Sequence, residues 1–273
     1  MKKIFKYYIY DMCGNVTALV DADDISKKIR KIINDEIMKE NNNVEQVGFV
    51  SLKEYKLTMA GGEFCGNATR GSAYYYLNGK KGEINLKVAN DIVLKAGVDE
   101  NGNIWTEMPL YSGKEFYRKA SDGIYEIRLN GISFIILDEE KSGKYLKDKI
   151  NIKENAMELI KKYSESGAEV IGVIFEEKMK KDGIENIKIN PVVWVRSIDT
   201  LFYENACGSG TTAVGILESI KAGKSKNLDI IQPSNEIITT NVKLNEKGKT
   251  IEKITICGRL NIDKIERKVM IKI

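Results

Sequence analysis

Two similar short segments, half the chain apart, constrain the fold of this sequence more than any other feature. Residues 63–71 read Glu-Phe-Cys-Gly-Asn-Ala-Thr-Arg-Gly, and residues 204–212 read Glu-Asn-Ala-Cys-Gly-Ser-Gly-Thr-Thr. Each has Cys-Gly and a polar residue before a helical pattern, which ends near Gly79 or Gly223. Because Cys65 and Cys207 are 142 positions apart in 273 residues, two similar halves, each around one such helix, are the simplest architecture.

Strand-like patterns outnumber helical ones in the rest of the chain, which indicates an α+β protein. Apart from the two cysteine-led helices, helical spacing predicts a helix from Asp24 or Ser26 to Glu40 and another over 154–165. We expect strands at 4–10, 16–20, 47–52, 55–59, 83–89, 92–97, 103–108, 125–129, 132–137, 170–176, 191–197, 227–231, 236–244, 251–257 and 267–273.

The residue types present exclude several classes of chemistry. The chain contains no histidine, so Ser-His-Asp and Cys-His nucleophile systems are impossible, and any general base must be Cys, Asp, Glu, Lys or Tyr. Its four cysteines include no Cys-x-x-Cys pair, which argues against both a disulfide scaffold and a zinc site. No glycine-rich phosphate loop follows a strand, so we expect neither a nucleotide nor a metal.

Charge and hydropathy narrow the set of partners. The formal net charge of +4 is spread along the chain, which suits an anionic small molecule and does not resemble the basic stripe of a nucleic-acid binder. No apolar run reaches membrane-spanning length. The N-terminal segment MKKIFKYYIYDM resembles a signal peptide only in its first lysines, so we interpret it as a strand and expect a cytoplasmic protein.

A cysteine at the start of a helix has the environment of a reactive thiol. The unpaired backbone N–H groups of the first turn favour thiolate over thiol, and the same N–H groups form an anion site. The glycine after each cysteine lets a ligand approach the backbone, while Asn67 and Ser209 can cap the helix or donate to that ligand. An amino-acid carboxylate bound there has its α-carbon beside the sulfur.

Two such helix starts that share one carboxylate can invert a stereocentre. One cysteine, as thiolate, removes the α-proton, and the other, as thiol, returns a proton to the opposite face. The N–H donors stabilise the charge that develops on the carboxylate, and exclusion of water strengthens that effect. The sequence therefore predicts a racemase or epimerase that needs no cofactor, pyridoxal phosphate included.

The motifs resemble those of the diaminopimelate epimerase superfamily over nearly the whole chain. The resemblance includes Gly14-Asn15 after the first strand, Cys65-Gly66-Asn67, Ala206-Cys207-Gly208-Ser209-Gly210 and a C-terminal strand near Gly258. It implies two pseudo-symmetric domains, each a β-barrel-like sheet around a central helix, with halves at 1–118 plus 263–273 and at 119–262.

The same resemblance implies roles for single residues. Cys65 and Cys207 are the implied acid/base pair, and Gly66, Asn67, Gly208 and Ser209 the implied carboxylate cradle. Asn15 matches a substrate-binding asparagine of the family. Glu45 stands where phenazine-type relatives carry a functional glutamate, although a solvated charge explains it equally well. Two interpretations of Glu204 are open in the same way: contact with the substrate, or a local cap.

Six further positions have plainer interpretations. A surface salt bridge explains Arg70 about as well as a site role does. Tyr74, Tyr75 and Tyr76 are packing residues. Cys257 is a core residue of its strand, and Cys13 lies in a Cys-Gly-Asn turn that can approach the site.

The substrate follows from departures within the superfamily. Before Cys65 stands Leu-Thr-Met-Ala-Gly-Gly, where diaminopimelate epimerases carry Asn-Ala-Asp-Gly. The segments from Met59 to Thr69 and from Asp199 to Thr211 resemble the histidine racemase branch, so we expect L-histidine/D-histidine racemisation, with a homodimer as the assembly considered. Two alternatives remain: a diaminopimelate epimerase, and an amino-acid-binding or redox-sensing protein in which Cys65 and Cys207 form a reversible disulfide.

Overall fold

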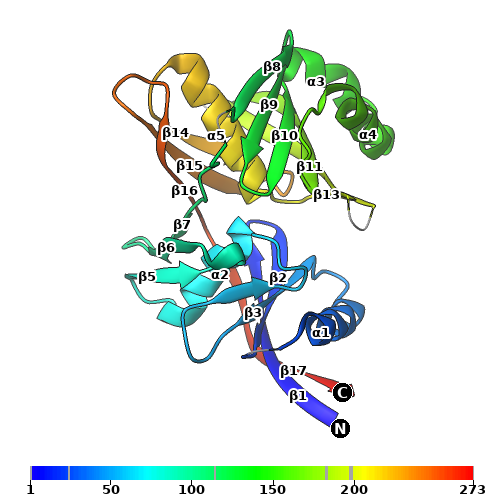
Figure 1. The fold of residues 1–273 in the computed structure, drawn as a ribbon, viewed down its shortest axis with the longest axis vertical. Helices are drawn as coiled ribbons and strands as arrows, with labels where there is room; N and C mark the ends of the chain where they lie inside the picture. Colours follow the sequence, from blue (N-terminus) through cyan, green and yellow to red (C-terminus); the bar gives the residue numbers. More distant parts are fainter. Residues whose placement is uncertain (1, 24, 114, 182–183, 197–198, 273) are drawn as a thin grey trace. The chain divides into compact units, whose positions relative to one another are not determined.

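The chain folds as an α+β protein with two mixed sheets, divided into two compact units (Figure 1). The computed structural model describes residues 2–23, 25–113, 115–181, 184–196 and 199–272. Unit 1 comprises Met1–Glu107 and Cys257–Ile273, and unit 2 comprises Met108–Ile256. Cys65 thus belongs to unit 1 and Cys207 to unit 2. The sequence expectations at Asp24, Ser197 and Ile273 lie outside the described residues.

Unit 1 combines a five-stranded sheet, in the order β17-β1-β2-β3-β4, with the antiparallel meander β5-β6-β7. Within the five-stranded sheet β2 and β3 are parallel, and the other pairs are antiparallel. The elements are β1 (Lys2–Met12), β2 (Asn15–Asp21), α1 (Lys27–Glu40), β3 (Gln46–Val50), β4 (Leu57–Met59), α2 (Gly66–Leu77), β5 (Gly82–Lys87), η1 (Ala89–Asp91), β6 (Val93–Val98), β7 (Ile104–Glu107) and β17 (Asn261–Lys272).

Unit 2 is built on strands in the order β16-β15-β14-β12-β11-β10-β9-β8, and β13 also pairs with β12. The pairs β10/β11 and β12/β14 are parallel. The elements are β8 (Tyr117–Ser121), β9 (Ile124–Leu129), β10 (Ile132–Leu137), α3 (Glu139–Leu146), η2 (Lys149–Asn151), α4 (Ile152–Tyr163), β11 (Val170–Lys181), β12 (Ile184–Val195), β13 (Thr200–Tyr203), α5 (Gly208–Ala222), β14 (Lys226–Ile231), β15 (Ile237–Leu244) and β16 (Ile251–Gly258).

Each unit buries one helix that starts at a cysteine. Every residue of α2 from Gly66 to Ala73 is buried, and ten residues of α5 are buried. Small side chains make this packing close: a β-carbon at Gly71 would collide with Met12 of β1, and one at Gly215 with Thr240 of β15. A helix that is buried all round needs no polar face, which is why neither segment shows the stripe of an ordinary surface helix.

The described structure confirms most of the expected elements and adds some. Ser26 caps α1, as expected, and the Asn130-Gly131 turn joins β9 to β10. Helix α2 ends at Leu77, and its C-cap is Asn78, one residue before the expected stop at Gly79; Asn78 adopts the left-handed conformation with φ 50°. The sequence analysis missed α3, β8 and β13, and β12 begins seven residues before its expected start at 191.

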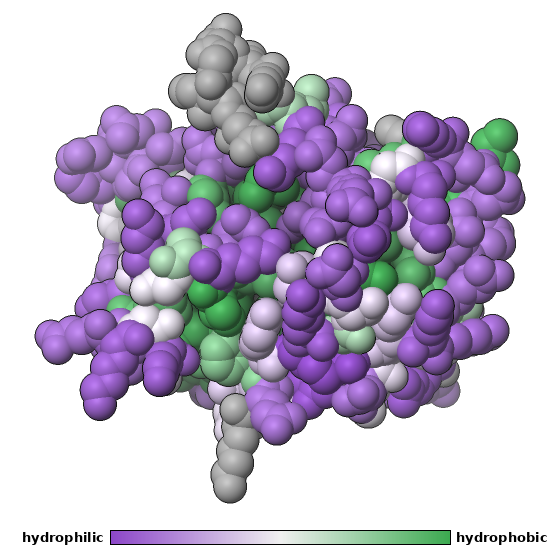
Figure 2. Space-filling view, turned by 90° about the horizontal axis from the view of Figure 1, so that it is seen from above, coloured by the Kyte–Doolittle hydropathy of each residue, from purple (hydrophilic) through white to green (hydrophobic). Residues whose placement is uncertain are grey.

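Polar side chains dominate the surface. On the face shown in Figure 2, hydrophilic side chains cover most of the area, and hydrophobic ones show mainly in the hollows between them. None of the described helices is long and apolar enough to cross a membrane.

Candidate active site

Helix α2 begins at Cys65, whose sulfur caps the first turn. Cys65 has extended backbone angles (φ −134°, ψ 114°), and its Sγ accepts the N–H of Ala68 at 3.4 Å. Thr69 adds a second contact, because its hydroxyl donates to the carbonyl of Cys65 at 2.7 Å. Cys65 as a residue is half-buried.

Helix α5 repeats this geometry at Cys207. The backbone angles of Cys207 (φ −126°, ψ 102°) nearly match those of Cys65, and its Sγ accepts the N–H of Gly210 at 3.2 Å. Cys207 is more enclosed than Cys65, with 4% of its surface exposed. The repeat seen in the sequence is therefore also a repeat in structure: in each unit a sulfur, and not an oxygen, occupies the N-cap position.

The two helix starts define one candidate anion site each. The first N–H groups of an α-helix have no carbonyl partner within the helix. The sulfurs take the third of these groups, in Ala68 and Gly210. The expected cradle residues Gly66, Asn67, Gly208 and Ser209 occupy the first two positions of their helices. Their contact with a carboxylate stays a prediction.

Asn15 and Glu45 are brought together by the parallel pair β2/β3. The Asn15 side-chain amide donates to Glu45 Oε2 at 2.9 Å, and its oxygen accepts the Thr17 hydroxyl at 3.1 Å and the Gln46 amide. Asn15 is buried and Glu45 half-buried. Glu45 lies directly before β3, and its hydrogen bond to Asn15 holds the carboxylate in place, so it is not a freely solvated charge. Its contact with substrate stays a prediction.

Glu204 lies in the short segment between β13 and Cys207. Its backbone N–H donates to the carbonyl of Pro191 at 3.1 Å, and the residue is half-buried. This contact fixes the main chain three residues before the sulfur, which leaves the role of the carboxylate as a prediction.

Gln232 is a residue of the α5 helix start that the sequence analysis missed. Its side-chain oxygen accepts the N–H of Cys207 at 2.9 Å, while its amide nitrogen donates to the Thr211 hydroxyl at 2.9 Å and to the Ile230 carbonyl at 3.0 Å. The side chain is completely buried. The only sequence signal is a polar Gln-Pro-Ser stretch directly after a buried strand.

Arg70 is not at the surface, so its interpretation as a surface salt bridge was wrong. The side chain is 0% exposed, and its Nη2 donates to Asn67 Oδ1 at 2.8 Å. Its Nε and Nη1 have no hydrogen-bond partner among the described residues, and no ion pair forms there. Arg70 lies in the second turn of α2, where every neighbouring helical residue is also buried.

The other two cysteines occupy different environments. Cys13 is buried in the β1–β2 turn with φ 60°, a conformation that costs free energy for any residue with a β-carbon, and its thiol donates to the carbonyl of Arg259 at 3.3 Å. Burial raises the pKa of the Cys257 thiol, although Arg70 lowers it in part. Neither of these two cysteines begins a helix.

The expected tyrosine packing is confirmed. Tyr74 and Tyr75 make ring contacts with Tyr10 and Tyr8 of β1. Burial raises the pKa of Tyr76 to about 12, and its hydroxyl donates to main-chain carbonyls, which suits a structural residue.

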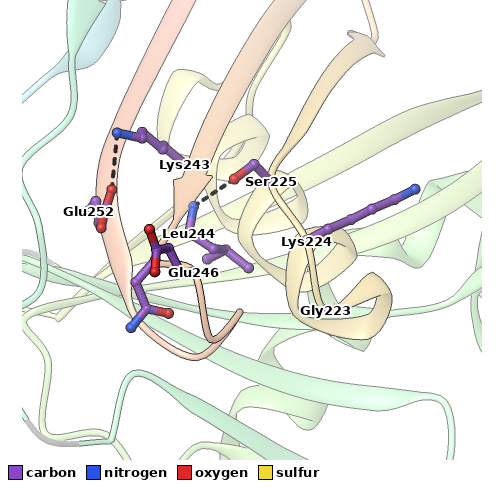
Figure 3. Close-up of a pocket in the computed structure, with 8 residues that line it drawn as sticks. Gly223, Lys224, Ser225, Lys243, Leu244, Glu246 and Glu252 are labelled. Carbon is purple, nitrogen blue, oxygen red and sulfur yellow. Dashed lines mark hydrogen bonds and ion pairs between the residues drawn. The ribbon is translucent and has the colours of Figure 1, made fainter.

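A cavity in unit 2 lies away from Cys207. It has a volume of about 440 Å³ and is lined by residues that include Gly223, Lys243 and Glu252 (Figure 3). Since it sits at the C-terminal end of α5, the helix separates it from Cys207 by about 22 Å. Nor do three carboxylate or thiol groups gather as a metal site would require, within the part of the chain that the structure describes.

Comparisons with known proteins show the family of this chain. The family model described as the histidine racemase CntK N-terminal domain matches residues 6–264. A histidine racemase from Fusobacterium nucleatum is 33% identical over 239 residues, covering 81% of this chain and 83% of the relative. A histidine racemase from Staphylococcus aureus is 22% identical over 268 residues, covering 90% and 92%.

Solved structures establish the fold class. A hydroxyproline epimerase from Agrobacterium vitis superposes with a TM-score of 0.62 at 11% identity, covering 98% of this chain and 92% of the other. A phenazine biosynthesis PhzF family protein from Enterococcus faecalis gives 0.58 at 13% identity, covering 99% and 100%. The chain is thus an α+β protein of the PhzF and proline racemase-like fold.

Within that class, the matching model and relatives identify one family of isomerases, the amino-acid racemases of the histidine branch. The chain belongs to the histidine racemase family. This membership confirms the resemblance drawn from the two cysteine motifs.

Proposed function

We propose that this chain racemises free histidine without a cofactor, with Cys65 and Cys207 as the two acid/base groups. One observation carries the proposal: in both units a cysteine sulfur caps a buried helix and accepts the N–H of that helix's third residue. The relatives described as histidine racemases support the choice of substrate.

The mechanism follows from the two helix starts. A thiolate on one helix removes the α-proton of histidine, and the thiol on the other gives a proton to the opposite face, so the stereocentre inverts. The N–H groups of Gly66, Asn67, Gly208 and Ser209 bind the carboxylate and stabilise the charge that it gains as the carbanion forms.

Asn15 and Glu45 form the proposed contact for the rest of the substrate. Their mutual hydrogen bond of 2.9 Å fixes a carboxylate in unit 1, and a carboxylate is a good partner for an imidazole N–H. Glu204 is the proposed substrate contact in unit 2.

The wider architecture is also a proposal. Strands of unit 1 pack against α2 and strands of unit 2 against α5, which supports a barrel-like sheet around each helix. The halves 1–118 plus 263–273 and 119–262 stay the proposed bounds. Since the mechanism needs reduced thiols, we propose a reducing, cytoplasmic environment, and a homodimer as the assembly.

The test is a chiral assay in D₂O. Purified protein with L-histidine and no added cofactor should produce D-histidine and incorporate deuterium at the α-carbon, whereas diaminopimelate should remain unchanged. Cys65→Ser and Cys207→Ser should each abolish racemisation, while Cys257→Ser, a matched change at a half-buried thiol outside the helix starts, should retain it. Full activity in either of the first two variants refutes the two-thiol mechanism.

A further inference from the structure

The two cysteine-capped helix starts differ in one charged residue. The first two turns of α5, Gly208–Gly215, contain no charged side chain, whereas those of α2 contain Arg70. The residue of α5 that corresponds to Arg70 is Thr212, whose hydroxyl donates to the carbonyl of Gly208 at 2.9 Å. A neutral residue in one unit thus replaces a guanidinium in the other.

Arg70 is buried, and among the described residues its guanidinium has no ion-pair partner. The guanidinium is protonated at every physiological pH, and a buried charge without a partner is costly. Its one hydrogen bond goes to the neutral amide of Asn67. The thiol of Cys257, which is close enough for its charge to matter, does not compensate it, because burial raises the pKa of that thiol.

We infer that the resting enzyme holds thiolate at Cys65 and thiol at Cys207, and that Arg70 is the positioning residue that creates this difference. The inference rests on the proposed two-thiol mechanism and adds to it the direction of the first proton transfer. Arg70 acts through space on the sulfur and through Asn67 on the helix start, since its side chain has no exposed surface for a ligand.

Other charged groups near α2 do not oppose this assignment. Glu63 precedes Cys65 by two residues but is exposed, so water screens it. The acidic groups on the strands that pack against α2 are engaged elsewhere: Asp11 at Gly14, Asp21 at Tyr75, Glu83 at Lys95 and Glu107 at the Lys95 main chain. On the same strands Lys6, Lys87 and Lys95 form ion pairs with Glu266, Glu54 and Glu83.

Around α5 the charged groups cluster at the end opposite Cys207. Lys221 pairs with Glu218 and lies over the Tyr125 ring, and Glu176 interacts with both. Charged side chains on the strands beside α5 are paired or bonded outward: Glu126 with Arg118 and Arg128, Lys188 with Asn235, Asp229 with Thr239, and Lys243 with Glu252. At the Cys207 end, Glu204 is half-buried and lies three residues before the sulfur.

The size of the effect follows from helix geometry. Cys65 and Arg70 are five residues apart, which is a rise of about 8 Å along α2. For a unit charge about 8 Å from a thiol, with an effective dielectric constant near 20, the ionisation midpoint of the thiol shifts by roughly one to one and a half pH units.

In each turnover the protons then move in a defined order. Cys65 thiolate takes the α-proton and becomes a thiol, while Cys207 thiol gives its proton to the opposite face and becomes a thiolate. The resting state returns when Cys65 releases its proton to solvent and Cys207 takes one up. The resting enzyme therefore accepts the enantiomer whose α-hydrogen faces Cys65.

Alkylation by iodoacetamide tests the difference directly, without histidine or turnover. The rate at Cys65 in Cys207→Ser, and at Cys207 in Cys65→Ser, is followed against pH by mass spectrometry of the modified peptides. The midpoint for Cys65 should lie about one pH unit below that for Cys207. Equal midpoints, or a lower one at Cys207, overturn the inference even if the enzyme racemises histidine.

Arg70 variants in the same two backgrounds identify the cause. Arg70→Met should raise the Cys65 midpoint by about one pH unit, and Arg70→Lys, which keeps the charge, should restore most of the shift. The Cys207 midpoint should not move, which serves as the internal control against a general loss of structure. An unmoved Cys65 midpoint in folded Arg70→Met removes Arg70 from the mechanism; if that variant does not fold, the comparison between Cys65 and Cys207 still decides the inference.

Discussion

A single methyl group distinguishes the third residue of the two cysteine-capped helices, Ala68 in α2 and Gly210 in α5. A β-carbon at Gly210 would lie 3.1 Å from Cys207 Sγ and 3.3 Å from a methyl of Ile174. That contact is tighter than ordinary packing allows, so the sulfur must move by a few tenths of an ångström. The absence of a side chain at Gly210 therefore helps to set the position of the more enclosed of the two sulfurs.

We predict that Gly210→Ala lowers racemase activity roughly threefold to tenfold, because small displacements of a reacting group reduce rates steeply. Stability should change by less than about 1 kcal/mol, since the helix propensity gained offsets the crowding. Gly143→Ala in α3, where an added β-carbon meets no atom within 4 Å, is the matched control. A kinetic assay combined with urea denaturation separates the two effects; unchanged activity in Gly210→Ala contradicts the prediction.

A buried carboxyl group, Glu176, makes the stability of unit 2 depend on pH. Burial raises its pKa to about 7, and its Oε1 has no hydrogen-bond partner among the described residues. Because the folded-state pKa is above that of an unfolded glutamate, the folded protein binds the extra proton. The stabilising contribution is complete below about pH 4.5 and is lost as the pH rises through about 7.

The variant that tests this pH dependence is Glu176→Gln, which keeps the shape of the protonated group and cannot ionise. Relative to this variant, the wild type should lose about 3 kcal/mol of unfolding free energy between pH 5 and pH 8. Urea denaturation across that range measures the difference, with exposed Glu154→Gln of α4 as the control. Parallel stability curves for wild type and Glu176→Gln would show that the carboxyl group does not titrate in this way.

At the scale of elements, the start of α5 depends on a loop that is remote in the sequence. Gln232 follows β14, and its amide connects the backbone of Cys207 to Thr211. A second connection runs between main chains, where the N–H of Ser234 donates to the carbonyl of Asn205 at 3.1 Å. The β14–β15 loop thus holds the residues on both sides of Ala206.

Gln232→Ala should leave the N–H of Cys207 and the hydroxyl of Thr211 buried without this partner. Each unsatisfied buried group costs about 1–3 kcal/mol, so we expect a loss of unfolding free energy in that range or above it, together with lower activity. Gln232→Glu keeps an acceptor for the Cys207 N–H and should recover part of the stability. Chemical denaturation provides the measurement. Wild-type stability in Gln232→Ala would mean that the three hydrogen bonds contribute little.

The elements that the sequence predicted are those whose pattern is local. The cysteine N-caps, the Ser26 cap and the Asn130-Gly131 turn are each written within a few residues, and the structure has them. Helix α3 was missed because only Ser142 is buried within it, so no apolar periodicity marks the segment; its capping residue Asp138 was the available signal. The early start of β12 was missed although Ile187 and Ile189 alternate there with Asn186 and Lys188, a strand pattern along which the pairing with β11 continues.

The site was predictable only as far as its motifs extend. Cys65, Cys207 and their neighbours follow from two contiguous stretches, but Gln232 and the burial of Arg70 depend on tertiary contacts that no local pattern encodes. Arg70 illustrates the reason. An arginine within a helix is ordinarily solvated, and only the small residues around it, from Gly66 to Ala73, permit strands to enclose it on every side.

At the scale of the whole molecule, the proposed function requires one sulfur from each unit to reach the same substrate carbon. The requirement makes a prediction about chemical cross-linking. A short reagent with two thiol-reactive arms, such as dibromobimane, should bridge Cys65 to Cys207 in the wild-type protein, because both sulfurs must approach a single carbon. Cys13 and Cys257 are both in unit 1. A bridge between them joins other peptides than a bridge between Cys65 and Cys207, so the two products are distinguishable. Mass spectrometry of the digested protein identifies the bridged pair, and excess histidine should protect against it.

If Cys65 and Cys207 are each modified singly and never joined, with or without histidine, the two helix starts do not share a substrate and the racemase mechanism proposed for this chain fails.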